Sequence, residues 1–237
     1  MKKRWIEFTV LSLLVLGISQ ACFFGSVLAE REKEQKHGNI KFLWAFGAII
    51  KTADSVVFQS IDRDTALKTG DKIKFFIKLE KPCFVYLIYR SSQNEIKALF
   101  PHRFEVTDNE RNISQDYYIP LGNQWFELDD HVGQEKFYLL ASSDRLYELE
   151  AIINKYESVD TAQRPEIANK IQLEIRNLRK KHLKLKRHAE RPVNIIGGLR
   201  GTEKTVKNVS YDVANFALEI SANTLYSRTF TIDHRQP

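Results

Sequence analysis

The stretch TGDKIKFFIKLEKPCFVYLIYR at residues 69–90 limits the possible folds of this chain more than any other. Its first half alternates apolar and charged residues, with one face formed by Ile73, Phe75, Ile77 and Leu79 and the other by Lys72, Lys74, Lys78 and Glu80. This period of two predicts a strand with one buried face and one wet face. After Pro82, CFVYLIY is apolar on both faces, which predicts an adjacent, more central strand.

Cys83 opens the second strand, and it is either a reactive thiol or a packing residue. A reactive cysteine needs a neighbour that lowers the pKa of its thiol. Its neighbours include Phe84, Val85 and Leu87, which are apolar. We therefore predict that Cys83 is buried and behaves as a small hydrophobe.

The rest of the chain continues the β pattern and interrupts it once. Further strands are predicted at 40–50, 56–58, 95–100, 117–120, 125–128, 136–141 and 225–232. Between the last two, helical spacing after Ser142-Ser143-Asp144 and again after Pro165 predicts a helical hairpin whose second helix ends near His188. The segment 209–220 fits a helix or a strand equally well.

These elements predict a mainly β fold, an antiparallel β-sandwich or an open barrel, with the helical hairpin inserted at about 143–189, so α+β overall. We expect residues 39–237 to form a single domain, since 43% of the chain is apolar and can supply a core. The charged segment 30–38 is expected to be disordered.

The N-terminus carries the pattern of a secretory signal peptide over residues 1–29. Basic residues at 2–4 precede an apolar run, and Val27 and Ala29 occupy the positions that a leader peptidase reads. We expect export to the periplasm or the extracellular space, with cleavage after Ala29. Two alternatives are a lipoprotein acylated on Cys22 and an uncleaved N-terminal anchor.

A search for catalytic and metal-binding motifs gives no site. The sequence lacks G-x-S-x-G, S-x-x-K, H-E-x-x-H and P-loop motifs. Asp129-Asp130-His131 is a local cluster of ligand types, but consecutive residues on an extended chain point in opposite directions. We therefore predict no catalytic residue, no cofactor and no metal.

The segment RNLRKKHLKLKR at residues 176–187 is the most concentrated charge in the chain. Its basic residues are Arg176, Arg179, Lys180, Lys181, Lys184, Lys186 and Arg187. They indicate either a solvated helix face near a helix C-terminus or a surface for an anionic partner such as a membrane. We favour the solvated face and keep the seven residues as a candidate anion-binding surface.

The order of short motifs resembles a known family, the bacterial domain of unknown function 4384. The motifs are Leu67 with Gly70-Asp71, then FVYLIY, then Leu99–Pro101, then Ile119-Pro120 with Phe126–Leu128, and finally GQEKFYLLAS at 133–142. The resemblance covers about residues 66–143 and departs from the family at His102, where the family has Asn. It implies a β-sandwich and an accessory role, and no catalytic residues.

We expect an exported, non-enzymatic module of the cell envelope that binds a protein or a surface polymer. A hydrolase is the alternative, and it requires His102, His131 or His234 to meet a carboxylate in a pocket. Another is a peripheral membrane protein that uses the 176–187 helix. Nucleic acid is not an expected partner of an exported protein.

Overall fold

A computed structural model describes residues 40–52, 55–104, 113–182, 188–192 and 212–237. All of them belong to one compact unit, Asn39–Pro237. The predicted signal peptide, the segment 30–38 and Lys184, Lys186 and Arg187 lie outside the described residues. Among the described residues, no helix combines the length and the apolar character needed to cross a bilayer.

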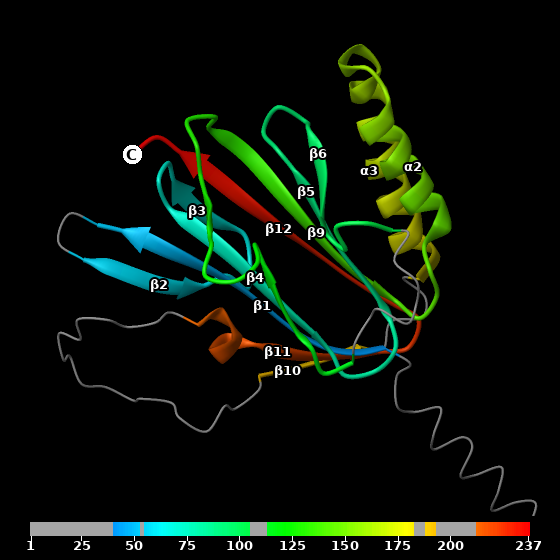
Figure 1. Ribbon diagram of the computed structural model, residues 1–237, viewed down its shortest axis with the longest axis horizontal. Coiled ribbons are helices and arrows are strands. Elements are labelled where there is room, and N and C mark those ends of the chain that lie inside the picture. The colour runs from blue at the N-terminus through cyan, green and yellow to red at the C-terminus, as the bar shows by residue number, and fades with distance from the viewer. Residues whose placement is uncertain (1–39, 53–54, 105–112, 183–187, 193–211) are drawn as a thin grey trace, which may run out of the picture. The chain divides into compact units, whose positions relative to one another are not determined.

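Two β-sheets form the body of this unit (Figure 1). The larger sheet contains β1 (Ile40–Lys51), β2 (Val56–Ser60), β4 (Lys72–Leu79), β7 (Asp116–Ile119), β8 (Phe126–Glu127), β10 (His188–Pro192) and β11 (Leu218–Ala222). The smaller sheet has the order β3-β12-β9-β5-β6, with β3 (Thr65–Lys68), β12 (Leu225–Arg235), β9 (Gly133–Ser142), β5 (Phe84–Arg90) and β6 (Ile96–Phe100). The mainly β, sandwich-like fold is therefore confirmed.

The core lies between the two sheets and is rich in aromatic rings. Phe46 of β1 stacks on Phe75 of β4 with ring centroids 3.8 Å apart. From the other sheet, Phe137 and Phe230 pack on Phe46 at 5.3 and 5.4 Å. Aromatic side chains bury the largest apolar areas, so this cluster joins the two layers.

A helical hairpin covers the outer face of the smaller sheet. It consists of α2 (Tyr147–Ser158), the short η2 (Thr161–Gln163) and α3 (Arg164–His182), and Figure 1 shows it beside β5 and β6. Leu149, Ile153 and Ile171 pack against Tyr86 and Leu140 of the sheet. Side chains at odd and even positions of β5 and β9 point to opposite faces of the sheet. One face packs against the larger sheet and the other against the helical hairpin, so both strands are apolar on both faces.

Several details differ from the sequence prediction. The runs 72–79 and 84–90 are both strands, but they belong to different sheets rather than pairing with each other. The turn between them is held on β1, where the backbone N–H groups of Glu80 and Lys81 donate to the carbonyl oxygen of Lys41. The first helix begins at Tyr147, and no side chain caps it. His188 starts β10 rather than ending a helix, since residues 188–192 pair with β11.

The ambiguous segment contains both kinds of element. Residues 213–216 form the 3-10 helix η4 (Val213–Phe216), and β11 follows at Leu218. The predicted wet face of β4 is also partly buried, because Lys74 is only 5% exposed. Its ammonium donates to the carbonyls of Gly122 and Gln124 and lies 5.2 Å from the ring centre of Tyr118. Cys83 is 3% exposed, which confirms its prediction as a packing residue.

Candidate functional site

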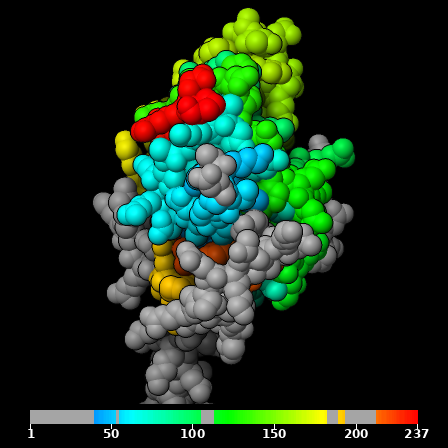
Figure 2. Space-filling model, turned by 90° about the vertical axis from the view of Figure 1, so that its left-hand side faces the viewer, coloured from blue at the N-terminus to red at the C-terminus, as the bar shows by residue number. Residues whose placement is uncertain are grey.

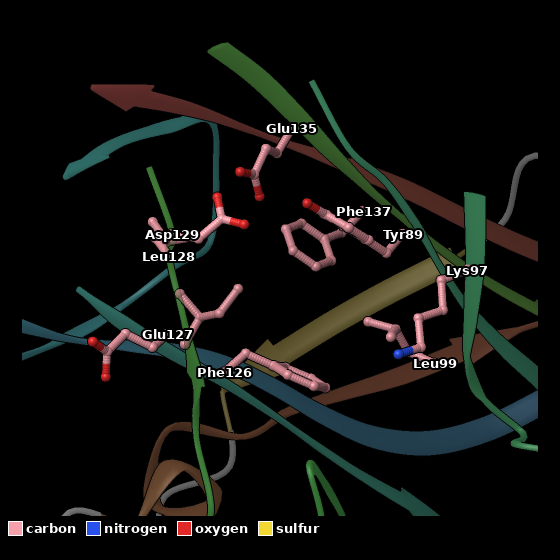
Figure 3. Close-up of a pocket in the computed structure, with 10 residues that line it drawn as sticks. Tyr89, Lys97, Leu99, Phe126, Glu127, Leu128, Asp129, Glu135 and Phe137 are labelled. Atoms are coloured by element: carbon pink, nitrogen blue, oxygen red, sulfur yellow. The ribbon is translucent and has the colours of Figure 1, made fainter. Parts of the chain in front are cut away.

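A cavity of about 170 Å³ opens at one end of the sandwich, between the edge strand β6 and the segment that contains β8 (Figure 3). Its lining residues come from both sheets and are Ile73, Tyr89, Lys97, Leu99, Phe126, Glu127, Leu128, Asp129, Glu135 and Phe137. We call this cavity the flank pocket. Enclosed space with a few polar groups on apolar walls is the usual form of a ligand site.

The strand register explains why polar groups gather here. Tyr89 of β5 pairs with Phe137 of β9 on one side and with Lys97 of β6 on the other. Glu135 lies two residues before Phe137, so it shares the face that looks toward the other sheet. On β5 and β9, the inner face is apolar from Val85 and Ala141 onward and becomes polar at this end, where Tyr89 and Glu135 lie.

Glu135 is held by a chain of hydrogen-bonded groups. Its Oε1 lies 3.0 Å from Nδ1 of His234, and both residues are nearly fully buried. Nε2 of His234 lies 3.0 Å from Oγ1 of Thr69. The Thr69 hydroxyl in turn donates to the carbonyl oxygen of Asp129 at 2.9 Å.

The geometry of this chain also fixes its charge. Thr69 has one hydroxyl proton and gives it to Asp129, so its oxygen accepts a proton from Nε2 of His234. A second proton lies between Nδ1 and the Glu135 carboxyl group. The His234–Glu135 pair therefore holds two protons and has no net charge, which suits its burial.

Tyr89 and Asp129 complete the polar end of the flank pocket. Burial raises the pKa of Tyr89 well above its ordinary value, and the carboxylates of Glu135 and Asp129 raise it further, so its hydroxyl stays protonated. The backbone N–H and then the ring of His131 hold the pKa of Asp129 below its usual range. Figure 3 shows the Tyr89 hydroxyl and both carboxylates gathered at one end, away from Lys97.

The remaining charges of the pocket differ in their partners. Glu127 forms an ion pair with Lys72 at 3.1 Å. Lys97 is exposed and makes no ion pair with any described residue. The side chain of Asp129 is 67% exposed, and its carboxylate is hydrogen-bonded to His131. Asp129 and Lys97 are thus the two charges most open to an incoming group.

The cluster Asp129-Asp130-His131 lies between β8 and β9. Oδ1 of Asp129 accepts from the backbone of His131 at 2.8 Å, and Oδ2 lies 3.1 Å from its Nδ1. Among the described residues, no three His, Cys, Asp or Glu side chains are grouped as a metal ion would require. Sequence reasoning noted His131 and His234 separately, and the structure places both beside Asp129.

The basic stretch is only partly available to an anion. Arg179, at the end of α3, is turned inward, where its Nε donates to Ser227 Oγ at 2.7 Å and its Nη2 donates to Thr229 Oγ1. Burial lowers the pKa of Arg179. Arg176, Lys180 and Lys181 are exposed. The structure therefore removes Arg179 from the candidate surface and leaves these three on it.

Comparison with known proteins identifies one segment of the chain. Residues 66–145 match the family described as Domain of unknown function (DUF4384). The match confirms the resemblance over that segment, about a third of the chain. No curated protein and no solved structure matches. Every residue that lines the flank pocket lies inside the matched segment, whereas His234 and the helical hairpin lie outside it.

Proposed function

We propose that this chain, with its DUF4384 segment, is an exported accessory module of the cell envelope that binds another protein or a surface polymer without catalysing a reaction. Export is supported by the basic, apolar and small-residue pattern that ends at Ala29. Mass analysis of the protein isolated from cells tests it, because cleavage after Ala29, acylation at Cys22 and an intact N-terminus give three different masses.

The flank pocket is the observation that carries the binding function. It combines an apolar floor with a cluster of polar groups, and its walls are held in place by the sheet register and by the His234–Glu135 pair. A site on rigid strands binds without first paying the entropy of ordering its own side chains.

Site-specific photo-cross-linking in cells tests this function. A photoreactive amino acid replaces Lys97 at the pocket or, as a control, the exposed Lys155 on α2. We expect a discrete adduct from position 97 and none from position 155. The adduct partner is then purified and its binding to the protein is measured directly. Equal adducts from both positions, or none from position 97, would contradict the proposed site.

A hydrolase remains the second candidate, because two histidines meet carboxylates of the flank pocket. His234 contacts Glu135, and His131 contacts Asp129. Both ring nitrogens of His234 are engaged, however, and the nearby Ser92 hydroxyl donates to the His131 backbone rather than to its ring. His102 lines a different cavity, with Asn154 and Glu157. Hydrolysis of ester or glycoside substrates that is abolished by Glu135→Gln would favour the hydrolase.

A further inference from the structure

The polar end of the flank pocket has the electrostatic character of a cation site. The carboxylate of Asp129 is ionised and open to solvent, and the buried Glu135 and the Tyr89 hydroxyl oxygen lie at the same end (Figure 3). All of these groups present oxygen atoms that accept hydrogen bonds. Because the His234–Glu135 pair has no net charge, Asp129 supplies the negative charge at this end, in a chain whose formal net charge is +6.

The walls behind this end suit an aliphatic stem that carries a positive charge. The ring of Tyr89 lies 5.0 Å from that of Phe137, and Phe126 forms the opposite wall. Aromatic rings attract a cation through their faces and also pack against methylene groups. Leu99 and Leu128 extend the apolar floor, so a long basic side chain finds both of the environments that it needs.

The size of the cavity matches one side chain. Its volume is about 170 Å³. A dry cavity of about 150 Å³ holds a benzene molecule. The flank pocket therefore has room for a single lysine or arginine side chain.

The position of the pocket indicates how that side chain arrives. The pocket lies beside β6, which is the last strand of the smaller sheet, and beside β8, which pairs only with β4 among the described strands. Partner segments commonly bind such edges in extended form, with alternate side chains entering pockets. Lys97 of β6 lies away from the carboxylates (Figure 3). It repels a second positive charge and so directs the cation toward Asp129.

We propose that the flank pocket binds one lysine or arginine side chain, presented by an extended segment of a partner protein, with the charged head at Asp129 and Tyr89 and the stem on Leu99 and Phe126. This inference rests on the proposed binding function and names its ligand chemistry.

A charge series of short peptides tests the inference on the purified protein. The peptides have one neutral, extended sequence of valine and threonine, with lysine, norleucine or glutamate at the central position. Norleucine keeps the stem and removes the ammonium. We expect the lysine peptide to bind about tenfold more tightly than the norleucine peptide, the combined effect of one ion pair and one cation–π contact. Calorimetry or ligand-observed NMR measures the three affinities.

Two matched variants locate the effect. Asp129→Asn removes the charge and keeps the Oδ1 that accepts from His131. Asp130→Asn removes one charge from the neighbouring exposed residue, which does not line the pocket. We expect Asp129→Asn to lower the preference for lysine over norleucine from about tenfold to about threefold, because the ion pair is lost and the cation–π contact stays, and Asp130→Asn to leave it unchanged. Unfolding midpoints of both variants confirm that they fold.

Each other result overturns the inference. Tighter binding of the glutamate peptide, equal binding of lysine and norleucine, equal effects of the two variants, or no binding of any peptide would each refute it. The cross-link at position 97 separates this failure from that of the proposed function. If position 97 cross-links to a protein but the peptides show no preference for lysine, the proposed function stands and the lysine-binding inference fails. If the adduct is a protease-resistant polymer, the inference of a protein partner fails alone. If no adduct forms, both the proposed function and the inference fail.

Discussion

The network around Glu150 gives the sharpest test of how the helical hairpin is held on the smaller sheet. Glu150 is 4% exposed, and its carboxylate accepts from the Tyr86 hydroxyl at 2.7 Å and from Arg145 Nε at 2.8 Å. The Arg145 Nη2 also donates to the Phe104 carbonyl, and the Tyr86 oxygen accepts from Leu146 N at 3.1 Å. One carboxylate thus joins α2 to β5 and to the chain after β6.

Replacing Glu150 with alanine leaves two donors without their acceptor. A hydrogen bond to a charged group contributes about 1.5–3 kcal/mol, and removing one partner of a buried ion pair costs about 3–5 kcal/mol. The side chain of Arg145 is 23% exposed, so water recovers part of its loss. We therefore expect the free energy of unfolding to fall by about 4 kcal/mol. With a denaturant slope of about 2 kcal/mol per molar urea, the midpoint falls by about 2 M.

Urea unfolding of the purified protein, followed by circular dichroism, measures this change. Glu150→Gln keeps an acceptor for Tyr86 and loses the charge, so we expect about half the effect, near 2 kcal/mol. Glu148→Ala, on the exposed side of the same helical turn, is the control and should cost no more than about 1 kcal/mol. If Glu150→Ala costs no more than this control, the network does not hold the hairpin and our reasoning is wrong.

Three further predictions concern packing and titration. In Gly47→Ala, the new Cβ would lie 2.6 Å from the ring of Phe58, so we expect the free energy of unfolding in urea to fall by about 1–3 kcal/mol. Adding Phe58→Leu should largely reverse this loss, and an unchanged unfolding midpoint in Gly47→Ala would contradict the prediction. Cys83 should stay unlabelled by a thiol reagent until the protein is denatured, and rapid native-state labelling, located by peptide mapping, would show it to be exposed. Burial and then the Asp212 carboxylate raise the pKa of Tyr118 to about 12. Protonated Tyr118 therefore stabilises the folded state fully below its unfolded pKa of about 10, and this stabilisation is lost as the pH rises toward 12. Tyrosinate absorbance should show this ionisation at lower pH in Asp212→Asn, and an unshifted titration would argue against the contact.

Most strands could be predicted from the sequence because their pattern is local. Alternation marks β4, and continuous apolar runs mark β5 and β9, which are covered on both faces. β3 was missed because it has four residues and its parallel partner is β12, far along the chain. β10 was missed because its residues are charged and its strand conformation depends on pairing with β11.

The candidate site was harder to predict, because its residues become neighbours only through sheet pairing. His131 and His234 attracted attention by residue type, but Tyr89 and Lys97 look like ordinary strand residues. One signal was present in GQEKFYLLAS. Glu135 has the same parity as Phe137 and Leu139, so it is an acid on a face that should be buried. An acid at such a position indicates either a buried pair or a site.

The central place of β12 in the smaller sheet has a consequence for the time course of folding. β12 follows every other strand along the chain, yet it separates β3 from β9, and β3 pairs with no other described strand. The contact between Thr69 and His234 spans 165 positions. Pairing between such distant residues is slow to form, because the chain loses the entropy of closing a long loop before any contact stabilises the closed state. We therefore expect the His234–Glu135 contact, which holds one wall of the flank pocket, to be among the last contacts to form.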